Sequence, residues 1–355
     1  MFTSDRPRAA ALSLLLTLVG PACATGAALG PTGAPAPEVV PAGLAGLRWG
    51  AGRLAPTLNS RLARAFAAGV DELPGVSPRS LFRSRDRQRW WTAEAAAALS
   101  DAERAELEPF EATEEVYYTV RWGSPVSYAR PLEILAEHGW GEVSGTKILD
   151  FGFGYITHLR LLGLLGADAH GVDVDPIHPA LYSRPEDQGE VLARTGVRGR
   201  VTLHHGRFPA DPRVEAEVGG GYGLIISKNV LKYGYVHPRR PTDPKRLLQL
   251  GVSDEVFLRA LREALLPGGA MLIYNLCPAQ APPDQPYIPY ADGESPFTRQ
   301  QWEQAGFEVI AFDRNDSAAA RELAHLLGWD LPSEGEPGMD LERGLFAWYT
   351  LVRRR

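Results

Sequence analysis

Residues 147–155 read Lys-Ile-Leu-Asp-Phe-Gly-Phe-Gly-Tyr, and an apolar helical pattern follows at residues 159–165. A short apolar run that ends on the carboxylate of Asp150, then two closely spaced glycines and a helix, is typical of the first turn of a nucleotide-binding α/β sheet. Gly152 and Gly154 can take backbone angles that a Cβ atom would forbid, so a ligand can approach the main chain closely. The helix is expected to offer free N–H groups at its first turn.

The pattern continues to the C-terminus as short apolar runs that alternate with helical stretches. One such helix, residues 255–266, ends at a Pro-Gly-Gly turn, which stops helices. This alternation predicts a doubly wound, mainly parallel, seven-stranded Rossmann-like sheet with helices on both faces, over residues 146–355. The expected strands are residues 147–150, 169–173, 201–204, 223–227, 270–275, 307–311 and 346–352.

A second carboxylate, Asp173, closes the second expected strand. In nucleoside-binding sheets a carboxylate at this place accepts both hydroxyl groups of a ribose. The alternative for Asp173 is a helix cap, a role that Asp175 can already fill in the sequence Asp175-Pro176. We therefore expect Asp173 to bind a ligand.

Together these elements resemble the class I S-adenosylmethionine-dependent methyltransferases, over residues 146–352. Residues 150–154 resemble the first motif of the family, in which the glycine turn cradles the methionine part of the cofactor. Residues 171–175 resemble the second motif, with Asp173 on the ribose. The resemblance implies S-adenosylmethionine as the cofactor and Asp150, Gly152, Gly154 and Asp173 among the residues that bind it.

Two further segments extend the resemblance. Residues 224–231 are similar to the motif of the fourth strand, whose end faces the transferred methyl group, and residues 265–269 resemble the Leu-x-Pro-Gly-Gly turn before the fifth strand. The sequence departs from the family where Ile156 replaces its third glycine and Arg207 replaces an acidic residue near the adenine. The adenine is then expected to be held by a main-chain amide and by packing on Phe208.

Transfer of a sulfonium methyl group needs an in-line nucleophile, so positioning and exclusion of water do most of the catalytic work. At the end of the fourth strand Lys228, Asn229 and Lys232 are the polar candidates to line the pocket. Asn229 is expected to orient the nucleophile; the alternative is a loop asparagine that caps the next turn. Tyr128 and Arg130 are expected to close over the cofactor carboxylate, or else to pack the preceding segment on the sheet.

Three classes of function remain open. The first is an active methyltransferase acting on a small molecule or a protein side chain, and the second is a degenerate binding or scaffold domain. The third, a nicotinamide-dependent oxidoreductase, is disfavoured because no lysine has a tyrosine four residues before it. No metal is expected, because the histidines do not show ligand spacing with cysteines or paired carboxylates.

The chain before residue 146 divides into three parts. Residues 1–23 have a basic start, a short apolar run and small residues around Cys23, the layout of a secretory signal or a lipoprotein leader in which Cys23 carries the lipid. An uncleaved leader or a misplaced start codon is the alternative. Residues 24–45 read as an Ala/Gly/Pro-rich linker. Residues 46–145 are expected to be helical, with Ser100 and Glu103 at capping-box spacing.

Composition limits the partners. The net charge is −6, which gives no indication of nucleic-acid binding, and a membrane is expected only through a lipid at Cys23. Only four of the 37 basic residues are lysines, as in proteins from GC-rich bacterial genomes. The leader favours export, whereas a cofactor made in the cytosol favours the cytoplasm, so the sequence leaves the compartment open.

Overall fold

The computed structural model describes residues 40–119, 124–332 and 337–355. The predicted leader, with Cys23, lies outside the described residues. In the part that is described, no helix is both long and apolar enough to span a membrane.

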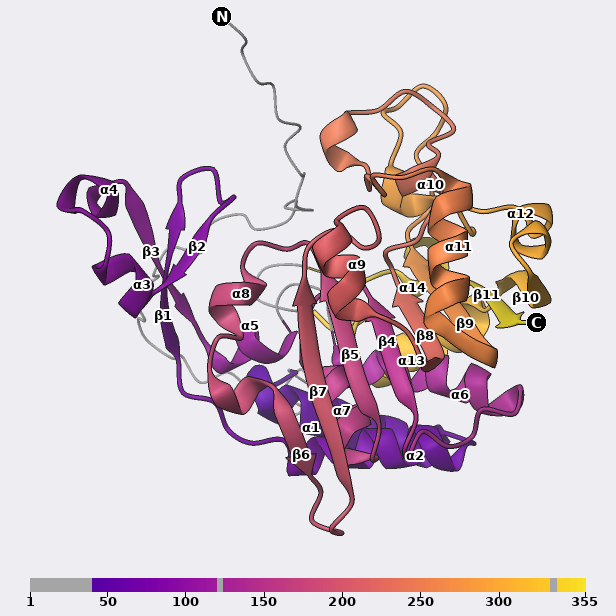
Figure 1. Ribbon diagram of the computed structural model, residues 1–355. Helices are drawn as coiled ribbons and strands as arrows, with labels where there is room; N and C mark the ends of the chain where they lie inside the picture. Colours follow the sequence, from indigo (N-terminus) through magenta and orange to yellow (C-terminus); the bar gives the residue numbers. More distant parts are fainter. Residues whose placement is uncertain (1–39, 120–123, 333–336) are drawn as a thin grey trace, which may run out of the picture.

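The centre of the molecule is an eight-stranded sheet in the order β10-β11-β9-β8-β4-β5-β7-β6 (Figure 1). Strands β7, β5, β4, β8 and β9 pair in parallel, whereas β11 runs antiparallel between β9 and β10, and β6 antiparallel to β7. The strands are β4 (Lys147–Phe151), β5 (Asp168–Asp173), β6 (Gly189–Leu192), β7 (Arg198–His205), β8 (Tyr222–Lys228), β9 (Leu265–Cys277), β10 (Phe307–Asn315) and β11 (Phe346–Arg354).

All seven strands expected from the sequence are present, which confirms the doubly wound, mainly parallel fold. The sequence analysis does not predict the eighth strand, β6, because its four residues are too few to show a periodic pattern. From β4 the chain adds β5 and β7 on one side and then crosses over to add β8 and β9 on the other. The order therefore reverses between β4 and β8, the place where such sheets bind ligands at the carboxyl ends of their strands.

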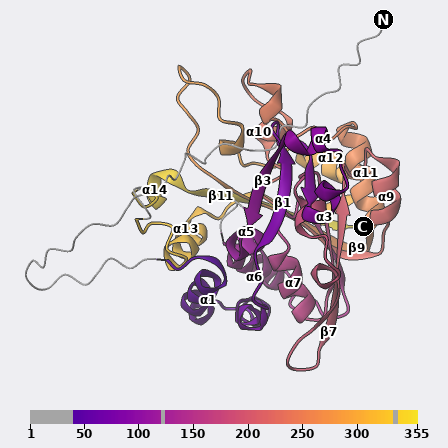
Figure 2. The ribbon, with the colours of Figure 1, turned by 90° about the vertical axis from the view of Figure 1, so that its left-hand side faces the viewer.

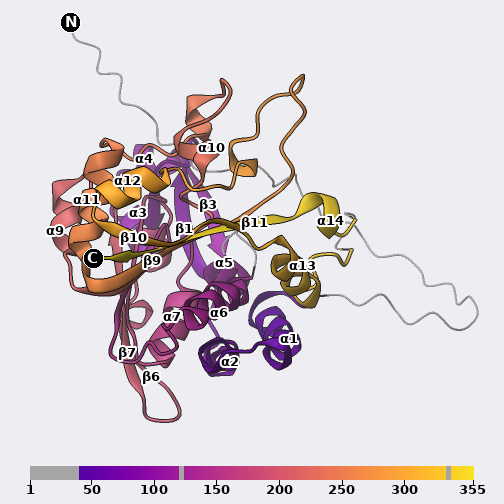
Figure 3. The same cartoon turned by 90° about the vertical axis from the view of Figure 1, so that its right-hand side faces the viewer.

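Helices cover both faces of the sheet, as the edge views show (Figures 2 and 3). One face carries α9 (Pro212–Val218), α11 (Asp254–Ala264) and α12 (Arg299–Gln304). The other carries α6 (Ala129–Glu137), α7 (Thr157–Leu164) and α13 (Ser317–Leu326), with α1 (Gly43–Leu54) and α2 (Arg61–Ala68) outside them. The shorter helices and 3-10 turns are α3 (Ala93–Ala97), α4 (Asp101–Ala105), α5 (Glu114–Thr119), α8 (His178–Leu181), α10 (Tyr233–Val236), α14 (Leu341–Gly344), η1 (Ala55–Thr57), η2 (Gly69–Glu72), η3 (Pro125–Tyr128), η4 (Pro185–Asp187), η5 (Pro244–Arg246) and η6 (Pro289–Ala291).

The N-terminal part contains both helices and strands, and the capping box of Ser100 and Glu103 is present at the start of α4. It also contains a small antiparallel sheet that the sequence analysis does not predict, formed by β1 (Arg79–Ser84), β2 (Trp90–Thr92) and β3 (Leu107–Ala112). Its strands are short, and α3 and α4 separate β2 from β3, so no strand pattern stands out. The small sheet packs against α8 (Figure 1).

The N-terminal helices share one hydrophobic core with the large sheet. Phe66 of α2 and Leu132 of α6 are fully buried in the same cluster as Leu161 of α7 and Ile226 of β8. Burying such side chains contributes about 1.5–3 kcal/mol each relative to exposure. The helices before residue 146 are therefore part of the layer that covers one face of the sheet.

A buried ion pair joins the small sheet to the rest of the protein. Arg79 of β1 is 5% exposed, and its Nη1 and Nη2 lie 2.6 and 2.7 Å from the two carboxylate oxygens of Asp187 in η4. The Tyr117 hydroxyl donates to Asp187 Oδ1 (2.8 Å), and the backbone N–H of Arg184 donates to Oδ2 (2.9 Å). The Asp187 carboxylate is thus satisfied entirely by the protein.

We predict that Asp187→Ala lowers the free energy of unfolding by about 3–5 kcal/mol, because it leaves the Arg79 guanidinium buried without its counter-charge. Urea denaturation followed by circular dichroism measures the loss. Glu108→Ala is the control, since it removes the partner of Arg83 from a pair in which Glu108 is 44% exposed. Such a pair contributes about 0–1 kcal/mol, and equal losses in both variants would contradict the assigned role of Asp187.

Candidate functional site

The carboxyl ends of β4 and β8 bring two charged groups to one face of the sheet. Asp150 of β4 pairs with Ile226 of β8, so Lys228, two residues further along, lies on the same face. Ile226 belongs to the core beneath α6 and α7, which identifies the face. Tyr128, the last residue of η3, lies over this end of the sheet and contacts both groups.

The Asp150 carboxylate is enclosed by an imidazole and a phenol. Its Oδ2 lies 2.7 Å from Nε2 of His158 in α7, and neither side chain is more than 1% exposed. The Tyr128 ring stacks on His158 with centroids 3.9 Å apart and planes 5° from parallel. Burial, together with the Asp150 charge, raises the pKa of Tyr128 well above its ordinary value, so this phenol stays neutral. Asp150 faces His158 rather than open solvent.

Lys228 is buried, with 6% of the residue exposed. Its Nζ lies 5.2 Å from the centroid of the Tyr128 ring and forms no hydrogen bond with any residue that the structure describes. Burial lowers the pKa of Lys228 to about 8, although the Asp150 carboxylate acts in the opposite direction. Near neutral pH the protonated form still predominates, but the neutral fraction of this amine is larger than that of an ordinary lysine.

Lys232 is buried as well, but its surroundings differ. Its Nζ donates to the carbonyl oxygens of Leu276 (2.5 Å) and Tyr290 (3.1 Å). Burial also lowers the pKa of Lys232 to about 8. Lys232 ties the segment after β8 to the end of β9, whereas the amine of Lys228 is left without an acceptor.

The glycine turn has the backbone conformation expected from the sequence. Gly152 and Gly154 have φ of 78° and 62°, values that side chains rarely adopt. The amides of Gly152 and Ile156 donate to Val172 O (2.8 Å) and the Tyr182 hydroxyl (3.2 Å), so a ligand cannot use them. No side chain caps α7, which agrees with the expected free N–H groups at its first turn.

Asp173, at the end of β5, lies directly beside this turn. Its Oδ2 accepts the N–H of Gly154 (2.9 Å) and its Oδ1 that of Asp175 (2.8 Å). Asp175 in turn accepts the N–H of Ile177 (3.1 Å), so it forms the local turn expected of it. A carboxylate offers about four acceptor positions, so about two remain on Asp173, whose side chain is 13% exposed.

The loop after β8 rests on the glycine turn. A Cβ atom placed on Gly152 would lie 2.5 Å from Cγ2 of Val230. Asn229, with φ of 67°, donates its N–H to Tyr274 O (3.0 Å), and its Oδ1 accepts the N–H of Leu276 (2.7 Å). These contacts tie Asn229 to β9 and not to the next turn, so they do not show the expected cap, and its action on a nucleophile stays a prediction.

Phe208 and Arg130, which were also expected at the site, are held in contacts within the protein. Phe208 is 3% exposed and packs in the core of the opposite face, in the same cluster as Phe151 and Val172. Arg130 Nε and Nη2 donate to the carboxylate of Asp316 (2.9 and 2.7 Å), next to α13. The structure therefore gives Arg130 a structural partner, and packing on the sheet is the interpretation that fits it.

The sequence analysis misses two histidines of this region. His158 contacts Asp150, and His178 of α8 lies with Nε2 2.8 Å from Gly154 O while its ring stacks on Phe153, centroids 4.6 Å apart. The sequence offers one indication for each: His158 stands at the start of an otherwise apolar helix, and His178 follows shortly after Asp173. Neither spacing indicates a contact, because the contacts depend on how α7 and α8 fold back on the strand ends.

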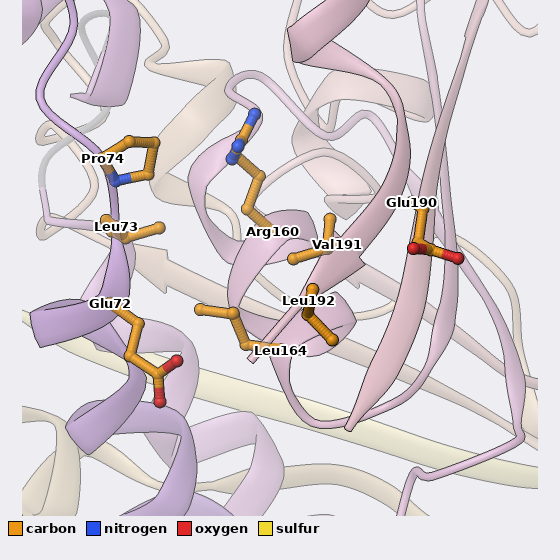
Figure 4. Close-up of a pocket in the computed structure, with 8 residues that line it drawn as sticks. All are labelled: Glu72, Leu73, Pro74, Arg160, Leu164, Glu190, Val191 and Leu192. Carbon is orange, nitrogen blue, oxygen red and sulfur yellow. The ribbon is translucent and has the colours of Figure 1, made fainter. Parts of the chain in front are cut away.

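Within the described ranges, no group of three or more His, Cys, Asp or Glu side chains could hold a metal ion. A hollow of about 230 Å³ lies elsewhere, at the β6 edge between η2 and α7 (Figure 4). It contains none of the expected site residues. Its lining is Glu72, Leu73, Pro74, Arg160, Leu164, Glu190, Val191 and Leu192.

No protein-family model and no curated protein matches the sequence. Among solved structures, the chain is similar to an S-adenosylmethionine-dependent methyltransferase from Mesorhizobium loti, with 17% identity and a TM-score of 0.33, over 64% of this chain and 98% of that one. It is also similar to magnesium protoporphyrin IX methyltransferase from Synechocystis PCC 6803 with bound SAH, with 14% identity and a TM-score of 0.34, over 65% and 83%. A [4+2]-cyclase gives 14% identity and a TM-score of 0.36, over 66% and 83%. We base the fold on the observed strand order and the function on the site.

We predict that Gly152→Ala lowers the free energy of unfolding by about 2–4 kcal/mol, through the strain of a positive φ and the overlap with Val230. Adding Val230→Ala removes the overlap but not the strain, so the double variant should lose less than the two single losses combined. Urea denaturation provides all the values.

Gly139→Ala is the control for the strain alone, because Gly139 has φ of 96° and nothing within 4 Å of an added Cβ. Its loss should be about 1 kcal/mol. Strictly additive losses at Gly152 and Val230 would show that the loop does not rest on the turn.

Proposed function

We propose that the protein is an S-adenosylmethionine-dependent methyltransferase. The observation that carries the proposal is the Asp173 carboxylate, which lies at the carboxyl end of β5 beside Gly154 and keeps about two acceptor positions for hydroxyl groups. The reversal of strand order next to it is where doubly wound sheets bind nucleotides.

The residues present fit two parts of the cofactor, the ribose and the methionine part. Asp173 would accept the ribose hydroxyls, and the positive φ of Gly152 and Gly154 gives a turn without side chains against which the methionine part would lie. Since the amides of Gly152, Gly154 and Ile156 are used within the protein, the turn would hold the cofactor by its shape, and the first turn of α7 would supply N–H donors.

When bound, the cofactor supplies an activated methyl group, and the protein has to hold an acceptor in line and keep water out. Lys228 and Tyr128 lie on the sheet face next to the glycine turn and are the groups best placed to meet the acceptor. We propose a small molecule or a protein side chain as the acceptor, with no nucleic acid. Attachment to a membrane through Cys23 remains a proposal that rests on the leader alone.

We predict that the protein binds S-adenosylhomocysteine and that Asp173→Asn weakens binding at least tenfold. The loss corresponds to about 1.4 kcal/mol, within the range for hydrogen bonds to a charged group. Isothermal titration calorimetry measures both affinities. The amide keeps the size of the carboxylate, but one of the two oxygens that accept the N–H groups of Gly154 and Asp175 becomes an NH2 donor. Urea denaturation of the variant therefore has to show that the fold is retained.

Asp168→Asn is the matched control, since Asp168 starts the same strand at the opposite edge of the sheet. It should leave binding unchanged. Absence of S-adenosylhomocysteine binding to the wild-type chain would overturn the proposed function in favour of a degenerate domain. Equal binding by the wild type and Asp173→Asn would overturn the role of Asp173.

A further inference from the structure

Lys228 is buried on this face of the sheet, and its amine forms no hydrogen bond with the described residues. The fold does use the amine of Lys232, which holds two backbone carbonyls, and that of Lys147, which donates to Gly220 O (3.0 Å). Lys228 Nζ has no hydrogen-bond acceptor among the described residues, although the residue is only 6% exposed. The Nζ atom is not one of the fully buried unpaired polar atoms of the described residues, so a ligand can reach this amine and supply the acceptor that it lacks.

The groups around Lys228 come from four elements. Asp150 of β4 is the anionic group, and Tyr128 of η3 presents its ring to Nζ at 5.2 Å. His158 of α7 lies behind the Tyr128 ring, and Tyr274, the register partner of Lys228 on β9, donates its hydroxyl to Asp316 (3.0 Å). None of these groups accepts a hydrogen bond from Lys228, and the aromatic ring beside Nζ favours a flat apolar ligand.

We propose that Lys228 takes the proton from the methyl acceptor, and that the acceptor is an acidic hydroxyl compound, a phenol or an enol. The inference rests on the proposed function. In this step the O–H bond of the acceptor breaks and the lone pair of Lys228 Nζ binds the proton. The oxygen keeps the electron pair that methyl transfer needs, and the new ammonium faces the Asp150 carboxylate, so charge is balanced within the site.

The strength of the base selects this class of acceptor. A carboxylate is already ionised and needs no base, whereas an aliphatic hydroxyl is too weak an acid for an amine with a pKa of about 8. A phenol has a pKa of about 10, as in tyrosine, close enough for a positioned amine to share its proton. An enol conjugated to a carbonyl has similar acidity and is equally flat.

The test uses 4-nitrophenol, whose phenolate absorbs visible light, with the full-length protein and saturating S-adenosylhomocysteine. Below the pKa of free nitrophenol, the wild type should increase the phenolate fraction several-fold, because the proton moves to Lys228. Lys228→Met should abolish the increase. Lys232→Met, the matched buried control, should retain it. The same phenolate fraction with the wild type and Lys228→Met would overturn the proposal, as would an increase that only Lys232→Met removes.

A second measurement follows the amine itself in the protein without ligand. Trinitrobenzenesulfonate reacts only with neutral amines, and peptide mass mapping separates the four lysines. Reaction at Lys228 should rise as the pH passes through about 8, because burial lowers its pKa. A reaction at Lys228 that begins only well above pH 8 would overturn the proposal.

Calorimetry distinguishes failure of the inference about Lys228 from failure of the proposed function. Wild type, Lys228→Met and Lys232→Met should bind S-adenosylhomocysteine equally, because none of these changes touches Asp173 or the glycine turn. If all three bind it and nitrophenol responds to none of them, the inference about Lys228 fails while the proposed function stands. If the wild type does not bind S-adenosylhomocysteine, the proposed function fails and the inference with it.

Discussion

The hydrogen bond from the Gly154 N–H to the Asp173 carboxylate connects the turn after β4 to the end of β5. At the same residue the chain takes a positive φ, a backbone conformation that glycine adopts readily. The hydrogen bond holds the first turn of α7 and the end of β5 in one geometry. The same contact leaves part of the carboxylate open, so the interaction that shapes the turn also shapes the ligand site.

The N-terminal part determines how far the carboxyl ends of β4 and β8 are shielded from water. Tyr128 covers the ends of β4 and β8, and α5 is held against the turn because the Tyr182 hydroxyl accepts from Ile156 and donates to Tyr117 O (2.9 Å). A parallel sheet with bare strand ends would expose Asp150 and Lys228 to water. Covered by aromatic rings, the two charges lie in a low-dielectric environment in which the lysine loses part of its charge.

The alternation of apolar runs and helical stretches from residue 147 onward predicted the doubly wound fold, and residues 147–155 with Asp173 predicted the central turn, because strand, turn and helix signals are local there. The small sheet β1–β3 could not be predicted, since β3 pairs with β1 from beyond α3 and α4, and the Arg79–Asp187 ion pair joins residues far apart in the chain. Arg130 and Phe208 show how far site residues can be predicted from the sequence. Their types suited a ligand, but their partners, Asp316 and the core beyond the sheet, are set by packing that the sequence does not display.

The most direct test of the account is a crystal structure of the protein with S-adenosylhomocysteine. The account predicts ribose hydroxyl groups within hydrogen-bond distance of the Asp173 carboxylate, the amino-acid part against Gly152 and Gly154, and the sulfur directed toward the face that carries Tyr128 and Lys228. A ligand seated elsewhere, for example in the hollow at the β6 edge, would contradict it.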